Sequence, residues 1–322
     1  MRAIQVAVTG ESDVLRMAVV PDPEPGPGEA LVQLEACGIN FIDVYQRRGL
    51  YPLPLPFILG QEGAGVVVAL GPDSGELAVG DRVAFTSIMG AYAEQIVVPA
   101  ARLVAVPDAM ETPTAAAIML QGLTAHYLAF DTFQLEPGST CLIHAGAGGV
   151  GLLLIQVAKR LGATVFTTVG TDAKAELATA AGADHVIVYT GADFAAEVRS
   201  VVGESGLDVV YDSVGVDTFD RSLELLRPRG LLALFGQSSG PVAPLDLSRL
   251  ARGGSLYVTR PTLGSYIASR EELERRSRDL FGWVVNGELS VRIGSTYPLE
   301  EAAAAHDALE GRATTGKVLL LP

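Results

Sequence analysis

The segment AGAGGVG holds the residues with the clearest chemical use in this chain. Gly146, Gly148 and Gly151 fit the pattern G-x-G-x-x-G between a strand-like and a helix-like segment. Glycine at these places permits a tight turn, close approach of the backbone to a pyrophosphate, and close packing of the helix. The following helix would offer free backbone N–H groups and a positive dipole end to the anion. The loop therefore predicts a dinucleotide site, which also includes Gly149 and Val150.

The end of the next strand indicates which dinucleotide fits. An NAD enzyme usually carries Asp or Glu there, to bind the ribose 2′-hydroxyl. Here the strand ends at Gly170 without an acid, and Thr171 and Lys174 follow. A carboxylate would repel a 2′-phosphate, whereas Lys174 could pair with one. Asp172 leaves open a displaced acidic partner for NAD, but the pattern favours NADPH.

Cysteine and histidine give no sign of a metal site or a disulfide framework. The only two cysteines are Cys37 and Cys141, a usage that fits a reducing cytosolic compartment. The histidines are scattered and lack the spacing of zinc ligands; they are His126, His144, His185 and His306. We expect Cys37 and His144 to be buried core residues rather than catalysts.

Alternating strands and helices are predicted around the glycine loop. Apolar strand-like segments occupy residues 139–145, 163–169, 185–189, 207–214, 231–236 and 255–261, and helical segments occupy residues 150–162, 173–182, 193–203 and 218–230. This alternation is typical of a parallel sheet covered by helices on both faces, the doubly wound pattern.

The rest of the chain has a different character. Its first third reads as many short strands joined by Gly and Pro turns, which predicts an all-β, barrel-like domain. A helical stretch follows over residues 112–130. The tail has two helical stretches, at 269–289 and 299–313, and a closing strand, KVLLLP. A length of 322 residues is enough for two domains.

Composition excludes some classes of partner. The formal net charge of −14 argues against non-specific binding of nucleic acid or anionic membranes. The longest apolar run is too short to span a bilayer, and the N-terminal residues lack the apolar core of a signal peptide. These features predict a cytoplasmic protein whose partner is a small molecule.

Several segments together resemble the medium-chain dehydrogenase/reductase superfamily. Within it, INFIDVYQRRGLYP, AGAGGVG, VVYDSVG and GSLYVTRP resemble the zinc-free NADPH:quinone oxidoreductase family, the zeta-crystallin-like branch. The resemblance implies an α/β protein with a GroES-like β-barrel-type catalytic domain over residues 1–125 and a Rossmann dinucleotide-binding domain over 126–263. It also implies that residues 264–322 return to the catalytic domain.

The resemblance carries expectations about chemistry. Zinc members of the superfamily have a cysteine and a histidine ligand where this chain has Asn40 and Gln61, and amides are poor zinc ligands, so no metal is expected. Without a Lewis acid, acceptors that take hydride readily are favoured, above all quinones. Two alternatives stay open: a reductase of small α,β-unsaturated carbonyls, and an NADPH-binding structural or regulatory protein of the crystallin kind.

The same resemblance implies the site residues. It places Asn40 and Gln61 beside the nicotinamide, where either amide could bind a quinone oxygen, and adds Asp43, Tyr45 and Tyr51 to the catalytic set. For the two tyrosines the alternative is ordinary packing. The implied cofactor contacts are Phe41, Ile42, Tyr127, Tyr189, Phe235, Gly236, Gln237, Ser238, Val258, Thr259 and Arg260. Relatives carry lysine at the position of Gln121, so a phosphate or substrate contact could be lost there.

The segment GSLYVTRP also predicts an association surface. It reads as the last strand of the parallel sheet, hence an edge, and an exposed apolar edge tends to pair with another strand. We expect a homodimer formed about a two-fold axis through Ser255–Thr259, as the resemblance also implies. The alternative is a monomer whose tail covers this edge.

Overall fold

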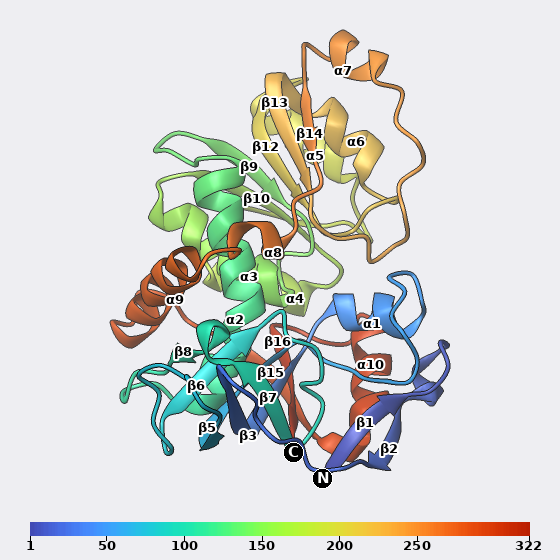
Figure 1. Ribbon diagram of the computed structural model, residues 1–322. Coiled ribbons are helices and arrows are strands. Elements are labelled where there is room, and N and C mark those ends of the chain that lie inside the picture. Colours follow the sequence, from blue (N-terminus) through green and yellow to red (C-terminus); the bar gives the residue numbers. More distant parts are fainter. The chain divides into compact units, whose positions relative to one another are not determined.

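Short strands separated by Gly and Pro turns build the first of two units in the computed structural model, which describes all 322 residues (Figure 1). This unit comprises residues 1–123 and 266–322. Its main sheet is mixed, with the order β15-β16-β3-β5-β6-β8 and β7 paired to β3; a smaller sheet has the order β2-β1-β4. The strands are β1 (Arg2–Val6), β2 (Arg16–Val19), β3 (Glu29–Ile39), β4 (Phe57–Ile58), β5 (Glu62–Leu70), β6 (Arg82–Thr86), β7 (Gln95–Pro99), β8 (Val104–Ala105), β15 (Ile293–Pro298) and β16 (Lys317–Leu321).

The C-terminal strand is built into this first unit. β16 pairs antiparallel with β3, with Val318 opposite Ile39, so the last residues of the chain contribute to the same core as the first. β15 was not predicted, because its residues alternate between half-buried and exposed and form no apolar run. The helices are α1 (Phe41–Arg47), α2 (Thr112–Tyr127), α8 (Leu263–Tyr266), α9 (Arg270–Val285) and α10 (Ala302–Glu310); α2 and α8 extend across the boundaries between the units.

The second unit, residues 124–265, is the predicted doubly wound domain. Its six strands are all parallel, in the order β11-β10-β9-β12-β13-β14, which is the 3-2-1-4-5-6 order of dinucleotide-binding sheets. The strands are β9 (Thr140–Ile143), β10 (Thr164–Val169), β11 (His185–Val188), β12 (Leu207–Asp212), β13 (Leu226–Leu234) and β14 (Tyr257–Thr259). The helices are α3 (Gly149–Arg160), α4 (Asp172–Ala180), α5 (Phe194–Val202), α6 (Phe219–Glu224) and α7 (Ser248–Arg252).

One predicted helix is wrong in its second half. The segment 218–230 is helical only over α6, which ends at Glu224, and strand β13 begins at Leu226. Proline lacks the backbone N–H and disfavours helical geometry in the residue before it, so Pro228 ends the helical pattern. The predicted edge position of β14 is confirmed, since β14 has only β13 as a neighbour in the sheet.

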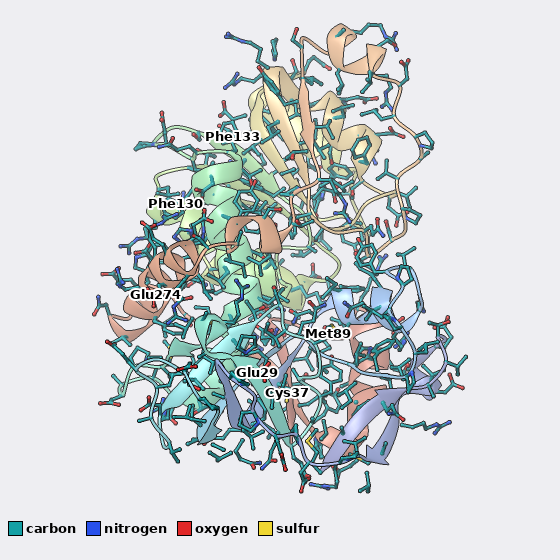
Figure 2. All side chains as sticks on the ribbon, viewed as in Figure 1. Glu29, Cys37, Met89, Phe130, Phe133 and Glu274 are labelled. Atoms are coloured by element: carbon teal, nitrogen blue, oxygen red, sulfur yellow. The ribbon has the colours of Figure 1, made fainter.

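Both cysteines are buried, as expected for Cys37, which lies on β3 (Figure 2), while Cys141 lies on β9. Burial raises the pKa of the Cys37 thiol to about 12 and the pKa of the Cys141 thiol well above its ordinary value. A thiol that stays protonated is a poor nucleophile, so neither cysteine is a catalyst at neutral pH.

None of the helices has both the length and the apolar character that crossing a membrane requires.

Candidate functional site

The glycine loop lies between β9 and α3, as predicted. The residue with left-handed backbone is Ala145, with a φ of 56°, rather than Gly146. Gly146 is needed for a different reason, because a Cβ there would overlap the hydroxyl of Thr167 on β10. A Cβ on Gly151 would lie 2.8 Å from the Cα of Gly146, so this glycine lets α3 pack onto the loop. Gly148 is the residue before the helix, and no side chain caps its N-terminus.

These features fit a dinucleotide. A Cβ on Gly148 would have one close neighbour, the carbonyl oxygen of Ala145 at 3.1 Å. Glycine at this position therefore leaves no side chain between the backbone N–H groups and a ligand. Gly148, Gly149 and Val150 would hold the pyrophosphate with backbone N–H groups of the uncapped helix end. The end of β10 carries no acid: Val169 is followed by Gly170 and by Thr171, whose side chain caps α4.

The predicted cofactor contacts of the second unit gather at the carboxyl ends of its strands, the edge where such sheets bind ligands. Lys174 lies in the first turn of α4 and is half-buried. The hydroxyl of Tyr189, which follows β11, lies close to Gly170. Phe235 begins the loop after β13, and Arg260 donates to the carbonyl oxygens of Leu234 (2.7 Å) and Gly236 (3.3 Å) in that region. Gly236, Gln237 and Ser238 continue the loop, and Val258 and Thr259 belong to β14. The remaining predicted contact, Tyr127, is not at a strand end; it is buried at the end of α2.

The segment INFID joins the last residue of β3 to the N-terminus of α1 in the first unit. Asn40 precedes the helix, and its backbone N–H donates to the Asp43 carboxylate at 2.8 Å in a capping box. This hydrogen bond satisfies one of the free backbone donors at the start of the helix. Phe41 and Ile42 follow in the first turn and are half-buried. The capping box therefore fixes the backbone that carries two of the predicted catalytic residues.

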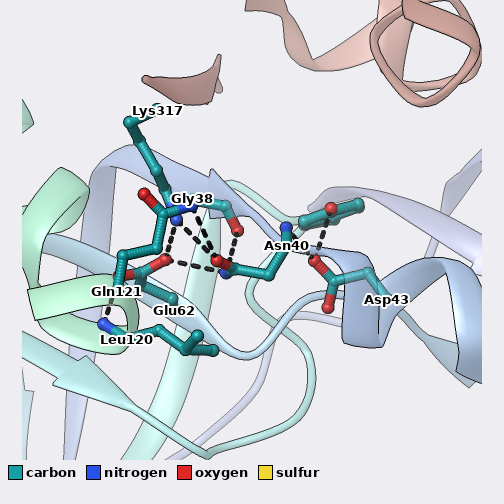
Figure 3. A network of polar contacts seen from close by, with 8 residues as sticks. Gly38, Asn40, Asp43, Glu62, Leu120, Gln121 and Lys317 are labelled. Carbon is teal, nitrogen blue, oxygen red and sulfur yellow. Dashed lines mark hydrogen bonds and ion pairs between the residues drawn. The ribbon is translucent and has the colours of Figure 1, made fainter. Parts of the chain in front are cut away.

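The Asn40 side chain is held on all sides by protein groups (Figure 3). Its Nδ2 donates to Oε2 of Glu62 at 2.8 Å and to the carbonyl oxygen of Gly38 at 3.4 Å. Its Oδ1 accepts from Nζ of Lys317 at 2.9 Å and from Nε2 of Gln121 at 3.3 Å. A primary amide has two donor hydrogens and two acceptor lone pairs, so the amide of Asn40 has none to spare for a ligand.

Gln61 differs from Asn40 in this respect. It directly precedes β5, is 8% exposed, and its Nε2 is buried without a hydrogen-bond partner. A buried amide donor without a partner costs free energy, and native proteins rarely keep one without a use. Of the two amides that the sequence singled out, Gln61 is the one with a donor available.

Asp43 ends a row of buried polar groups that starts at Arg47. The Arg47 guanidinium lies 3.1 Å from Nδ1 of His306, and Nε2 of His306 lies 3.1 Å from the hydroxyl of Tyr92. That hydroxyl donates to Oδ2 of Asp43 at 2.9 Å. A guanidinium can only donate, so Nδ1 of His306 accepts and Nε2 carries the proton. Every hydrogen bond in the row therefore points toward Asp43.

The titration of these groups follows from burial. Burial raises the pKa of Asp43 to about 7, against the opposing effects of the hydrogen bonds from Asn40 and Tyr92 and of the Lys317 charge. Oδ1 of Asp43 has no partner, in keeping with a carboxyl group that is readily protonated. Burial, together with the charge of Arg47, lowers the pKa of His306 to about 3, so this histidine is neutral at physiological pH.

Tyr45 and Tyr51 lie together beside α1. Their rings meet edge to face with centroids 5.4 Å apart, and the Phe41 ring lies 6.1 Å from that of Tyr45. Tyr51 is 36% exposed. The three rings offer an apolar aromatic surface next to the capping box, suited to a flat ligand.

Sequence reasoning missed Glu62 and Lys317, which form a buried ion pair. A signal was present, because each is a charged residue at the start of an apolar strand, and such residues are rarely buried unless paired. Tyr92 and His306 were also missed as partners of Asp43. No group of three or more His, Cys, Asp or Glu side chains is placed to hold a metal ion.

Comparisons with known proteins cover the whole chain. The family model Alcohol dehydrogenase GroES-like domain matches residues 26–108, and Zinc-binding dehydrogenase matches residues 149–280. Quinone oxidoreductase of Pseudomonas aeruginosa is 46% identical, covering 100% of this chain and 99% of that protein. A 2-haloacrylate reductase of Burkholderia sp is 43% identical, covering 92% of each. The crystal structure of Escherichia coli quinone oxidoreductase complexed with NADPH superposes with a TM-score of 0.98 at 43% identity, covering 100% of both chains.

Proposed function

We propose that this chain, which belongs to the quinone oxidoreductase family of medium-chain dehydrogenases/reductases, is an NADPH-dependent quinone oxidoreductase. The observation that carries the proposal is the full-length likeness to quinone oxidoreductases, one of them solved with NADPH. The bare glycine loop and the acid-free end of β10 support the choice of cofactor. When bound, NADPH supplies the hydride that reduces the acceptor.

The second unit binds and orients the cofactor. The loop from Gly146 to Gly151 holds the pyrophosphate, and Lys174 pairs with the 2′-phosphate. Tyr189 lines the adenosine side, next to Gly170. The loop after β13, braced by Arg260, continues the cofactor-binding surface.

The first unit binds the acceptor. A quinone gains negative charge on its oxygen as it is reduced, and a positioned donor stabilises that charge. Gln61 supplies this donor, because its Nε2 is buried and unpaired. Tyr45 and Tyr51 offer aromatic faces to the ring, while Asn40 and Asp43 hold the start of α1 in place.

Replacing Gln61 by Leu tests this assignment. Loss of a hydrogen bond to a charged oxygen costs about 1.5–3 kcal/mol, so kcat/KM for the quinone should fall roughly 10- to 150-fold. The dissociation constant for NADPH should not change. As a matched control we choose Gln95→Leu, since the Gln95 amide bonds to Gln33 away from this cluster. Unchanged quinone reduction by Gln61→Leu would exclude Gln61 as the donor.

A second candidate function is the reduction of activated alkenes. The specific support is the Burkholderia relative, a 2-haloacrylate reductase at 43% identity. The same donor would bind the carbonyl or carboxylate oxygen of an α,β-unsaturated acceptor. Rates of NADPH oxidation with 1,4-benzoquinone and with 2-chloroacrylate, compared at equal concentration, separate the two functions.

We also propose that the chain forms a homodimer through Ser255–Thr259. In support, β14 is the last strand of its sheet and Tyr257 on it is 60% exposed. Pairing of β14 with the same strand of a second copy would satisfy the open edge of the sheet and bury the Tyr257 side chain. A cytoplasmic location is proposed on the basis of the two free, buried cysteines.

A further inference from the structure

Two side chains from distant parts of the first unit end on the same oxygen atom (Figure 3). Lys317 at the start of β16 and Gln121 on α2 both donate to Oδ1 of Asn40, at 2.9 Å and 3.3 Å. Because the end of the Gln121 side chain already contacts this oxygen, an amine carried by residue 121 would approach it as well. A cation can therefore reach this oxygen from either of two positions in the fold.

Lys317 also balances a buried charge. Its ammonium contacts the Glu62 carboxylate, and both side chains are at most 1% exposed. The other carboxylate oxygen of Glu62 accepts the backbone N–H of Leu120. The position of Gly38 leaves room for the pair, because a Cβ there would overlap the carboxylate of Glu62 and Cε of Lys317. Because both side chains are buried and closely packed, neither charge can turn to water or to another partner without a large loss of free energy.

The two charges dictate which way the Asn40 amide points. An ammonium can only donate and a carboxylate can only accept, so Oδ1 must face Lys317 and Nδ2 must face Glu62. Gln121 cannot make this choice, because its own amide can turn to present either its oxygen or its nitrogen. The buried cation and the buried carboxylate thus fix the same orientation of the Asn40 amide, which the Gly38 carbonyl oxygen also favours as an acceptor of Nδ2.

We propose that Lys317 is a positioning residue for the acceptor site: it fixes the Asn40 amide and the Glu62 carboxylate, and so holds the neighbouring Gln61 with its amide donor toward the acceptor. Gln61 directly precedes Glu62, the first residue of β5, so an anchored Glu62 fixes the backbone next to Gln61. A second part of the proposal is that the cation works equally well from position 121. The inference rests on the proposed function, since it assigns a purpose to the Gln61 donor.

Three variants of the full-length protein test the role of the cation. Lys317→Gln removes it, and Lys317→Gln with Gln121→Lys moves it to α2. Lys317→Met with Glu62→Gln removes both charges and leaves no unpaired carboxylate. We expect Lys317→Gln to lower kcat for 1,4-benzoquinone by about 10- to 100-fold, the range for a displaced reacting geometry, with the NADPH dissociation constant unchanged. The relocated lysine should restore kcat to within about threefold of the original value.

The doubly neutral variant separates positioning from folding. Its unfolding temperature should recover relative to Lys317→Gln, because no buried charge is left without a partner. Its kcat should stay low, because no charged group then holds the Asn40 amide and only the longer hydrogen bonds with Gly38 and Gln121 are left to orient it. Recovery of kcat together with stability would overturn the proposal, as would a relocated lysine that leaves kcat low in a protein of normal stability.

A readout independent of turnover distinguishes this inference from the proposed function. The buried side-chain amide protons of Asn40 should exchange slowly in nuclear magnetic resonance spectra, exchange fast in Lys317→Gln, and slow again in the relocated variant. If the exchange rates follow this pattern but the protein reduces no quinone, the proposed function is refuted, while the role of Lys317 in positioning the Asn40 amide is retained. Slow exchange in all variants would refute the positioning. Lys159→Met, which removes a partly exposed lysine paired with Asp184 in the second unit, is the matched control and should change neither kcat nor exchange.

Discussion

The carboxyl group of Asp43 makes a pH-dependent contribution to stability that Asp43→Asn should abolish. Its pKa rises from an ordinary value of 3.8 to about 7, chiefly because the side chain is buried. Glu62 acts in the same direction, while Lys317, Tyr92 and the Asn40 backbone act against it. Asparagine has nearly the same shape and can still accept from Asn40 and Tyr92, so the substitution removes titration with little change in packing.

The sign of the effect follows from proton binding. Between about pH 4 and pH 7 the unfolded chain has lost the Asp43 proton while the folded chain keeps it, so the stability due to this group falls as pH rises. A difference of roughly three pKa units corresponds to about 4 kcal/mol across that window. Above about pH 7 the folded chain also loses the Asp43 proton, and the stability that depended on it is fully lost. Asp43→Asn should therefore gain stability relative to the unmodified protein as pH increases from 4 to 8, by up to this amount.

Denaturant unfolding measures this difference. The chain has a single tryptophan, Trp283, which lies on α9 in the same unit as Asp43, so its fluorescence reports the relevant transition. Unfolding curves in urea at pH 5, 6, 7 and 8 give the free energy for both proteins. The matched control is Asp108→Asn, which removes one carboxylate from an exposed position. A constant difference between Asp43→Asn and the unmodified protein at all four pH values would refute the reasoning.

Four further outcomes are expected. Lys174→Ala should weaken NADPH binding by about 1.5–3 kcal/mol and leave NADH binding unchanged, as measured by fluorescence titration; equal use of both cofactors by the unmodified protein would contradict the charge argument. Exhaustive chelation should leave quinone reduction intact, and elemental analysis that finds stoichiometric zinc needed for turnover would count against it. Light scattering should give twice the chain mass of 33.6 kDa, and Tyr257→Glu should halve it by placing like charges on the paired edges; a stable monomer of the unmodified protein rules out the dimer. Maleimide should leave Cys37 and Cys141 unmodified until the protein is unfolded, and rapid labelling of the native protein would show that a thiol is accessible.

The sequence by itself predicted the second unit in most of its detail. Apolar strands and amphipathic helices are local patterns, and a strand–glycine loop–helix order has one common structural outcome. The same local logic placed β14 at the edge of the sheet. It failed over residues 226–230, where the apolar spacing suggested helix and Pro228 prevented it.

Tertiary structure decided which polar residues of the first unit keep a hydrogen-bonding group without a protein partner. The sequence named Asn40 and Gln61 as equivalent amides, but only the fold shows one saturated by protein partners and the other with an unpaired donor. Asn40 meets Lys317 across a separation of 277 residues, and Tyr92 meets His306 across 214. Periodicity and spacing describe neighbours along the chain. A hydrogen bond between such distant residues depends on strand pairing and burial, because only the assembled sheet removes the water that would otherwise satisfy each group.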